Sequence, residues 1–280
     1  MAKKLRLTVL AALFLASGSL AACGGGGGSE SGGSGGEEGG GSGGGETLTI
    51  ASDIAYRPFE FDQGGEPVGF DIDLMNEIGN RAGFTPEYQN VTFDGIIPGL
   101  GSNLYDAAIS AMTITPEREE QIDFSDPYFD ADQSLMVPEA SDVESVEEGL
   151  ESSVVGVQIG TTGASQAEGF QQDGLIGEVR TFDTIEDAFS ALDNGQVDAV
   201  INDLPVSQDR VNQSDGALKL VQTIPTGEQY GIAFPQDSDM VEPVNQALQE
   251  IKDDGTYAEI YEEWIGRAPE SIPGEETTGE

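Results

Sequence analysis

Arg118 stands out because this chain carries few basic residues. The sequence has 52 Asp and Glu residues against 11 Lys and Arg residues, a formal net charge of −41. Thr115 and Pro116 are typical of a helix N-cap and a first helical position, and an Arg in a first turn opposes the helix dipole. A guanidinium can bind a carboxylate through two hydrogen bonds. Arg118 therefore either binds an anionic group or neutralises its acidic neighbours in solvent.

The lack of histidine removes many kinds of chemistry. The sequence contains no His and one Cys, Cys23. Catalytic triads, His-ligated zinc and imidazole acid–base catalysis all need residues that are missing. We therefore expect a protein that is not an enzyme and that uses no metal and no cofactor.

The N-terminal residues resemble the signal peptide of a bacterial lipoprotein. A basic start precedes a short apolar run, and small residues lead to Cys23 in "LAAC". An ordinary secretory signal ending near Ala22 would leave a lone thiol on an exported protein. We expect a signal peptide at 1–22, a lipid on Cys23 and an extracytoplasmic protein anchored to the cell membrane.

Composition separates a folded centre from two polar ends. Glycine and serine dominate residues 23–46, which predicts a flexible tether, and residues 268–280 are predicted to be a mobile acidic tail. About 220 residues remain, enough for two lobes with cores of their own. A surface this acidic repels nucleic acid and suggests adaptation to high salt.

Strand-like and helix-like segments alternate through the centre, which predicts an α/β fold with mostly parallel strands. "LTIAS", "TPEYQNV" and "SVVGVQ" are strand-like, and "GFDIDLMNEIGNRAG" is an amphipathic helix with Ile72, Met75, Ile78 and Gly79 on one side. Residues 93–111 align without a gap with residues 185–203, each predicting a helix, a turn and a strand that begins Asp-Ala. The pattern indicates two similar lobes.

Ligands of open α/β sheets bind beyond the carboxyl ends of the strands. In the two predicted lobes these ends lie at residues 53–56, 110–113, 160–162 and 202–203. Two lobes that face one another across these ends would form a cleft.

Eight segments in this order resemble the amino-acid-binding proteins of ABC importers, solute-binding protein family 3. They are "SDIAYRPFEF", "GFDIDLMNEI", "FDGIIPGL", "MTITPEREEQIDFSDPYF", "GVQIGTTG", "VDAVIND", "YGIAF" and "KDDGTYAEIYEEWIG". The resemblance implies a two-lobe periplasmic-binding-protein fold in which each lobe is a mixed, mostly parallel sheet flanked by helices. It also implies two hinge crossings, near 131–133 and 227–229. It implies lobe 1 at 47–131 and 228–267 and lobe 2 at 132–227.

The resemblance also implies roles for the residues at the strand ends. Arg118 would bind the carboxylate of an amino acid, helped by N–H groups near Thr113 and Thr161, and Asp203 would bind its ammonium with help from Ser110. Tyr56 and Phe93 would enclose the aliphatic part, and Asp53 and Gln158 would face the side chain. The predicted ligand-binding set is Asp53, Tyr56, Phe93, Ser110, Ala111, Thr113, Arg118, Gln158, Gly160, Thr161, Thr162, Asn202 and Asp203.

An acceptor at Asp53 favours a ligand side chain with N–H donors, such as glutamine, asparagine, arginine or lysine. Some relatives carry Lys where this chain has Gln158, so their specificity does not transfer directly. The expected partners are a polar amino acid, the transmembrane subunits of an ABC permease and the membrane through the Cys23 lipid, and we expect a monomer.

Two other functions share this fold. An enzyme similar to cyclohexadienyl dehydratase would need a cleft carboxyl group with a shifted pKa, for which Glu60 and Asp53 are candidates. A free binding protein could also present its ligand to a sensory receptor in place of a permease.

Overall fold

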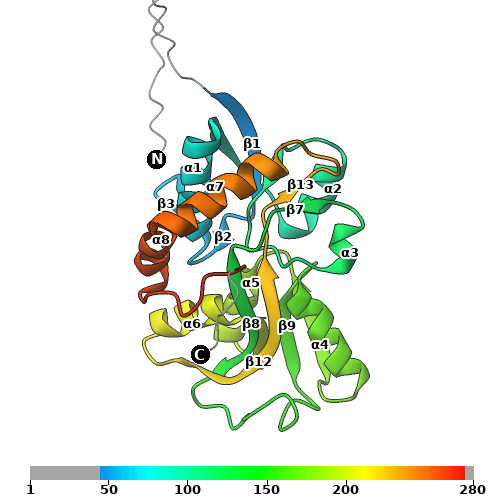
Figure 1. Ribbon diagram of the computed structural model, residues 1–280. Helices are drawn as coiled ribbons and strands as arrows, with labels where there is room; N and C mark the ends of the chain where they lie inside the picture. Colours follow the sequence, from blue (N-terminus) through cyan, green and yellow to red (C-terminus); the bar gives the residue numbers. More distant parts are fainter. Residues whose placement is uncertain (1–44, 275–280) are drawn as a thin grey trace, which may run out of the picture. The chain divides into compact units, whose positions relative to one another are not determined.

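The computed structural model describes residues 45–274 (Figure 1). The predicted signal peptide, Cys23 and residues 24–44 of the predicted tether lie outside the described residues, as do residues 275–280. β1 begins at Glu46, one residue before the predicted start of the first lobe.

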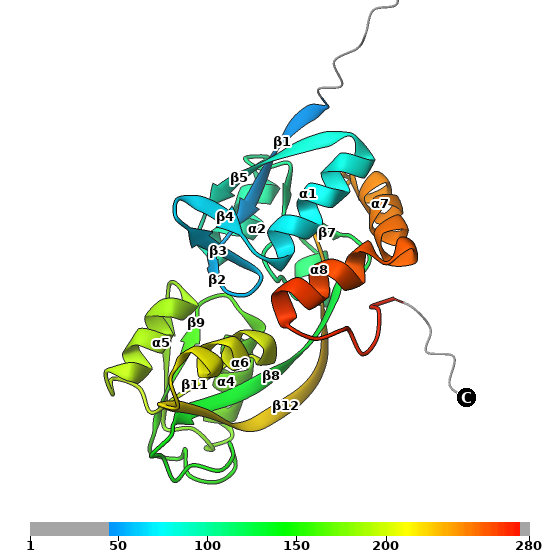
Figure 2. The same cartoon turned by 90° about the vertical axis from the view of Figure 1, so that its left-hand side faces the viewer.

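The first lobe is built on a five-stranded sheet in the order β5-β1-β6-β13-β7. Its strands are β1 (Glu46–Ser52), β5 (Phe84–Asn90), β6 (Ala107–Ala108), β7 (Asp123–Phe124) and β13 (Ala233–Phe234). A small sheet of β2 (Ala55–Tyr56), β3 (Glu60–Gln63) and β4 (Glu66–Val68) follows β1. The helices of this lobe are α1 (Phe70–Ala82), α2 (Phe93–Gly101), α3 (Pro116–Glu119), α7 (Val241–Asp254) and α8 (Thr256–Ile265). Both C-terminal helices contact α1 (Figure 2).

The second lobe is built on a sheet in the order β10-β9-β11-β8-β12. Its strands are β8 (Phe129–Pro138), β9 (Val154–Gln158), β10 (Glu178–Phe182), β11 (Ala199–Asp203) and β12 (Leu218–Tyr230). Its helices are α4 (Thr162–Gln172), α5 (Ile185–Asp193) and α6 (Leu204–Gln213).

Helix α1 shows how the sequence pattern becomes structure. Ile72, Met75, Ile78 and Gly79 are all buried, as their spacing predicts. Gly83 ends the helix in the left-handed conformation (φ 85°), and its N–H donates to the carbonyl of Gly79. A Cβ on Gly79 would lie 2.8 Å from the carbonyl oxygen of Phe84, so only glycine lets α1 lie this close to β5.

The internal repeat is confirmed, down to its hydrogen bonds. Asp106 accepts from the N–H of Thr49 at 2.7 Å, and Asp198 accepts from the N–H of Val154 at 2.8 Å. In each lobe the aspartate before the inner strand thus joins it to its parallel neighbour, β1 or β9. The same carboxylate-to-backbone bond explains why both strands begin Asp-Ala.

Both five-stranded sheets are mixed, as predicted, but parallel pairings are not in the majority. In the described residues, each five-stranded sheet has two parallel pairings, β1 with β5 and β6 or β9 with β10 and β11. The other two pairings of each sheet are antiparallel. The antiparallel pairings of each sheet all involve one strand, β13 in the first lobe and β8 in the second, with which the chain enters that lobe against the direction of the inner strands.

Strands β8 and β12 carry the chain between the sheets. They pair from Leu218 with Pro138 to Tyr230 with Phe129, but the register shifts between Ile224 and Glu228. There, Asp132 accepts from the N–H groups of Thr226 (2.8 Å) and Gly227 (3.2 Å). The interruption lies where the hinge crossings are expected, and the lobe boundaries themselves stay a prediction.

The prediction of a mobile tail is wrong for residues 268–274, which are held by contacts with the rest of the chain. Lys252 donates to the carbonyls of Pro127 (2.8 Å) and Pro273 (2.7 Å), and Ile272 packs on the main core. Ser271 donates to Asp130 at 3.3 Å. These contacts fix the segment beside the start of β8, and its Gly and Pro content reflects turns rather than a free tail.

Candidate functional site: a cleft between the lobes

The predicted strand ends meet in one small cavity, as the topology rule requires. The cavity has a volume of about 10 Å³ and is lined by Asp53, Tyr56, Phe93, Ser110, Ala111, Thr113, Arg118, Gln158, Thr161, Thr162 and Asp203. Gly160 and Asn202, the other two residues of the predicted set, contact it through hydrogen bonds to Arg118 and Tyr56. The structure thus brings the whole predicted set together.

Arg118 lies in the wall of this cavity and not in solvent, with 7 % of its surface exposed. It donates to the carbonyl of Thr113 at 2.6 Å and, across the cleft, to the carbonyl of Gly160 at 3.1 Å. No carboxylate of the described chain lies within ion-pair distance of it, so it does not neutralise its acidic neighbours. Burial lowers the pKa of Arg118, and Asp203 is the nearest source of opposing charge.

The position of Arg118 follows from the local sequence. The hydroxyl of Thr115 caps α3 by accepting from the N–H of Arg118 at 3.3 Å, and Pro116 occupies the first helical position. The guanidinium centre lies 5.3 Å from the ring centroid of Phe93, at the start of α2. A guanidinium has five N–H donors and uses two of them here, so three remain for a ligand.

Asp203 ends β11 and is surrounded by donors from three elements. It accepts from the hydroxyl of Tyr56 at 2.7 Å, from the hydroxyl of Tyr230 and from the amide of Gln133. Burial raises the pKa of Asp203, while these donors and Arg118 oppose that shift. A carboxylate has about four lone-pair sites, so one stays available for a cation.

Asp53 and Gln158 meet at another part of the cavity wall. The amide of Gln158 donates to Asp53 at 2.5 Å and to the carbonyl of Asp183 at 3.1 Å. Its Oε1 atom is buried and has no hydrogen-bond partner. Burial, and to a lesser degree the charge of Asp94, raises the pKa of Asp53 to about 6. This region therefore offers oxygen acceptors to a donor group.

The N-terminus of α4 faces Arg118 from the second lobe. The hydroxyl of Thr161 accepts from the N–H of Ala164 at 3.1 Å, and the hydroxyl of Thr162 lies 3.4 Å from that of Thr113. The leading N–H groups of a helix and its dipole favour an anion. They add to the positive charge of Arg118 on the same side of the cavity.

Five contacts join the lobes across the cavity and make it small. They are the bonds of Tyr56 to Asp203 and to Asn202, of Gln158 to Asp53 and of Arg118 to Gly160, and the approach of Thr113 to Thr162. A volume of about 10 Å³ is close to that of one water-sized probe. An amino acid can enter only when the lobes move apart.

Glu60 is not at the cavity surface, contrary to its suggested role in an enzyme. It is fully buried behind Ser110, whose hydroxyl donates to it at 2.8 Å. Of the two carboxyl candidates for acid–base chemistry, only Asp53 lines the cleft.

Three residues of the hinge strands adjoin the site but are missing from the predicted set. Tyr230 and Gln133 bind Asp203, and Glu228 accepts from Gln133 at 2.9 Å and from Thr162 at 3.2 Å. All three lie in β8 or β12, where side chains alternate between the cleft and the opposite face. The hinge expected near 131–133 and 227–229 was the signal that could have found them.

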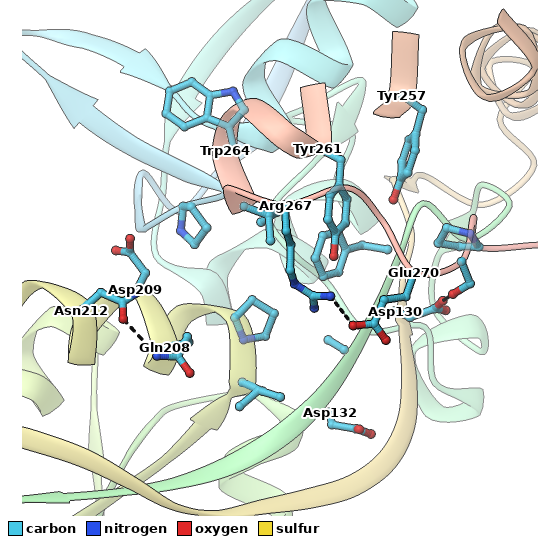
Figure 3. A pocket seen from close by; sticks show the side chains of 18 residues that line it. Asp130, Asp132, Gln208, Asp209, Asn212, Tyr257, Tyr261, Trp264, Arg267 and Glu270 are labelled. Carbon is cyan, nitrogen blue, oxygen red and sulfur yellow. Dashed lines mark hydrogen bonds and ion pairs between the residues drawn. The ribbon is translucent and has the colours of Figure 1, made fainter. Parts of the chain in front are cut away.

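A larger groove of about 580 Å³ lies elsewhere, between β8, α6, α8 and the C-terminal segment (Figure 3). Trp264, Tyr261 and Arg267 line one side, and Gln208 and Asp209 line the other. None of the predicted ligand residues lines it. Trp264 donates to Asp73 of α1 at 2.7 Å and so joins α8 to the first lobe.

Neither a membrane-spanning helix nor a metal site is found in the described residues. No helix among residues 45–274 is long and apolar enough to cross a bilayer. No group of His, Cys, Asp and Glu side chains in the same range has the arrangement of a metal site.

Several known proteins are similar to this chain in both sequence and fold. Residues 48–158 and 170–267 match the family model of bacterial extracellular solute-binding proteins, family 3. A probable histidine-binding protein of Neisseria gonorrhoeae is 31% identical over 267 residues, covering 92% of this chain and 95% of its own. An ancestral arginine-binding protein solved with arginine is 42% identical, with a TM-score of 0.74, over 78% of this chain and 97% of its own.

A third relative, the arginine-, lysine-, histidine-binding protein ArtJ of Geobacillus stearothermophilus, is 36% identical with a TM-score of 0.75. The similarity covers 80% of this chain and 97% of that one. All three are described as binding proteins and not as enzymes. The chain belongs to the bacterial extracellular solute-binding proteins, family 3.

Proposed function

We propose that this chain captures a polar amino acid outside the cytoplasmic membrane for an ABC importer, and that within this class its ligand is arginine. The observation that carries the proposal is Arg118: a buried cation with three spare donors and no carboxylate partner in the described chain. A buried charge without a partner is costly, and a ligand carboxylate would supply the partner.

Asp203 is proposed to bind the ligand's ammonium group. The two tyrosine hydroxyls and Gln133 hold it in place, and it lies near enough to Arg118 for their charges to interact. Ser110 Oγ, also in the cavity wall, is a second acceptor. An anion and a cation on opposite sides of one small cavity are complementary to a zwitterion.

The side-chain end favours a group with several N–H donors. Asp53 supplies carboxylate oxygens, and the unpartnered Oε1 of Gln158 supplies another acceptor beside it. A guanidinium can donate to both at once, because its donors form a planar fork. The ammonium of lysine and the amide of glutamine have fewer or differently placed donors.

The charge of the site points the same way. Asp53 and Asp203 line the cavity and Glu228 adjoins it, while Arg118 is the one basic residue among the lining residues. Such a site prefers a ligand with an additional positive charge over a neutral zwitterion. The arginine- and histidine-binding names of the relatives support this choice.

Calorimetry with arginine, citrulline, glutamine and norleucine tests the ligand assignment. Citrulline has the shape of arginine without its charge, so we expect it to bind at least tenfold more weakly. Glutamine should be weaker than arginine as well, and norleucine should show no binding. Equal affinities for arginine and citrulline would contradict a role for charge, and tighter binding of glutamine would make glutamine the ligand.

The anchor and the partners belong to the proposal too. The small residues before Cys23 support lipid attachment, which would hold the protein at the membrane beside a permease. A Cys23→Ser variant should leave the membrane fraction, whereas a Ser29→Ala variant in the tether should remain there. If Cys23→Ser remains after a high-salt wash, another element anchors the protein. We propose that the chain works as a monomer, which sedimentation of the released form will test.

A further inference from the structure

Two carboxyl groups lie behind the cleft and take no part in the proposed contacts with the ligand. Glu60 in β3 and Asp71 in the first turn of α1 are both fully buried. Neither lines the cavity. The burial of two acidic side chains requires an explanation, because a buried charge is costly unless it is paired.

Glu60 fixes the orientation of the Ser110 hydroxyl. Ser110 donates to Oε1 of Glu60 at 2.8 Å and accepts from the N–H of Asp53 at 3.0 Å. The only hydroxyl proton of Ser110 is therefore directed away from the cavity. What Ser110 can offer to a ligand is a lone pair, so it can only accept from an ammonium.

Asp71 fixes the turn that carries Ser110. Its Oδ2 atom accepts from the N–H of Ala111 and from the hydroxyl of Tyr128, each at 2.8 Å. Ala111 has a φ of 43°, a left-handed conformation that is unfavourable for a residue with a side chain. Tyr128 immediately precedes β8, so the same carboxylate also holds the entry to the hinge strand.

The other oxygen of each acid can be satisfied only by its neighbour. Oε2 of Glu60 and Oδ1 of Asp71 are buried without a hydrogen-bond partner, which leaves a hydrogen bond between the two carboxyl groups as the way to satisfy both atoms. Two carboxylates cannot form such a bond, since both only accept, so a proton must lie between them. Burial and the charge of Asp71 raise the pKa of Glu60 well above its ordinary value.

Within the described residues, no basic group faces the pair that could neutralise the charge in place of this proton. The groups that face the pair come from six elements or their ends: Asp53 after β1, Tyr56 in β2, Tyr88 in β5, Ser110 after β6, Tyr128 before β8 and Tyr257 in α8. None of these is basic. A second negative charge here would be uncompensated.

We propose that Glu60 and Asp71 are a positioning pair that shares one proton and keeps the Ser110–Ala111 turn as an acceptor surface for the ligand's ammonium group. This inference rests on the proposed amino-acid site and names residues that act on it from behind. Glu60 works through the Ser110 hydroxyl, and Asp71 works through the backbone of Ala111.

The shared proton is tested without any ligand, by thermal melts between pH 5 and 9. Because the pKa of Glu60 is raised, the native protein keeps a proton that the unfolded chain loses above pH 4.5. Stability should therefore fall as pH rises, by about tenfold in the unfolding constant per pH unit, until the native pair ionises. Glu60→Gln supplies a permanent donor to Asp71 and should flatten this dependence, whereas the exposed Glu66→Gln in the neighbouring strand should not. Parallel pH profiles for wild type and Glu60→Gln would overturn the shared proton.

The positioning role is tested by calorimetry with arginine. Glu60→Gln still accepts from Ser110 and should bind within about threefold of wild type. Glu60→Met, of similar length but without an acceptor, should bind at least tenfold more weakly. Ser110→Ala should be equally weak, and the double variant no weaker, because both remove the same acceptor. Full additivity, or unchanged binding in a folded Glu60→Met, would overturn the role.

Failure of the proposed function and failure of the proposed Glu60–Asp71 pair would give different results. If wild type binds none of the amino acids, the proposed function fails while the melts still decide the proton. If wild type binds arginine and the pH profiles are parallel, the pair fails alone. If Glu60→Met does not fold, the affinity of Glu60→Gln decides the role, since a loss of tenfold or more there contradicts it.

Discussion

The hydroxyl of Tyr56 in β2 donates a hydrogen bond of 2.7 Å to Asp203 at the end of β11, across the cleft. Tyr230, at the end of the hinge strand β12, donates to the same carboxylate oxygen. One acid thus receives hydrogen bonds from the first lobe and from the hinge. Closing of the lobes and orientation of the proposed ammonium-binding group are therefore a single event.

Removing Arg118 should weaken binding more than any loss of charge at the surface. Arg118→Ala leaves a ligand carboxylate enclosed without its partner, which costs about 2–5 kcal/mol. At about 1.4 kcal/mol per tenfold, affinity should fall about 30-fold to several thousand-fold. Arg180→Ala is the control, because the Arg180 side chain is 40% exposed and, within the described residues, its hydrogen bonds go only to Gln196 and Glu178. Calorimetry measures both, and a normal affinity in Arg118→Ala would return that residue to a structural role.

A blocked ligand should reproduce the loss of Asp203. Asp203→Asn keeps the shape and removes the charge, so arginine should bind with a loss of similar size to that in Arg118→Ala. Nα-acetylarginine, which has no ammonium group, should bind poorly to wild type and hardly worse to the variant. Such non-additivity identifies an interaction between the two altered groups. If the acetyl group and the substitution weaken binding independently, Asp203 contacts another part of the ligand.

Gln158→Lys should change which ligands bind. A lysine ammonium at this position would pair with Asp53, which now accepts from the amide of Gln158. It would also repel a guanidinium, so arginine should bind at least a hundredfold more weakly while glutamine loses little. Competition calorimetry with the two ligands gives the ratio, and Gln158→Met is a matched control that adds no charge. Equal losses for both ligands would show that the ligand side chain does not reach Asp53.

Arginine binding should depend on pH through Asp53. Burial raises the pKa of this carboxyl to about 6, so it is ionised at pH 8 and mostly protonated at pH 5. If binding needs the ionised form, affinity should fall about tenfold between pH 8 and pH 5, since the loss is one factor of ten per unit below the pKa. An Asp53→Asn variant should bind weakly at every pH and show no such slope. A wild-type affinity that rises on acidification would contradict the sign of this linkage.

Periodicity and strand-end topology account for most of the fold and for the four strand ends that line the site. The buried stripe of α1 and the repeat of Asp106 and Asp198 were expected from these patterns, whereas the placing of Arg118 in one site with Asp203 was implied by the family resemblance. What these signals lack is information on pairing direction. The antiparallel strands come from the crossings between lobes, and no local pattern in "AF" at residues 233–234 indicates its neighbours.

The polar groups that support the site were beyond sequence reasoning for a different reason. With 52 acids in the chain, Glu60 and Asp71 resemble surface residues until their burial is known. Tyr230 lies 27 positions from Asp203, and Gln133 lies 70 positions away. Only the pairing of β8 with β12 and with β11 brings these donors to one carboxylate.

The interrupted ladder between Ile224 and Glu228 has a mechanical consequence. A continuous two-stranded ribbon resists bending along its whole length, whereas the register of this ribbon shifts between Leu220 and Gln222 and, more widely, between Ile224 and Glu228. At the wider shift the Asp132 carboxylate accepts from the backbone of β12 in place of regular backbone bonds. Bending should concentrate at that place, so that each lobe turns as a rigid body about an axis fixed by the chain. The lobes would then open and close by rotation about a single axis, so that an arriving ligand would meet only a narrow range of open conformations.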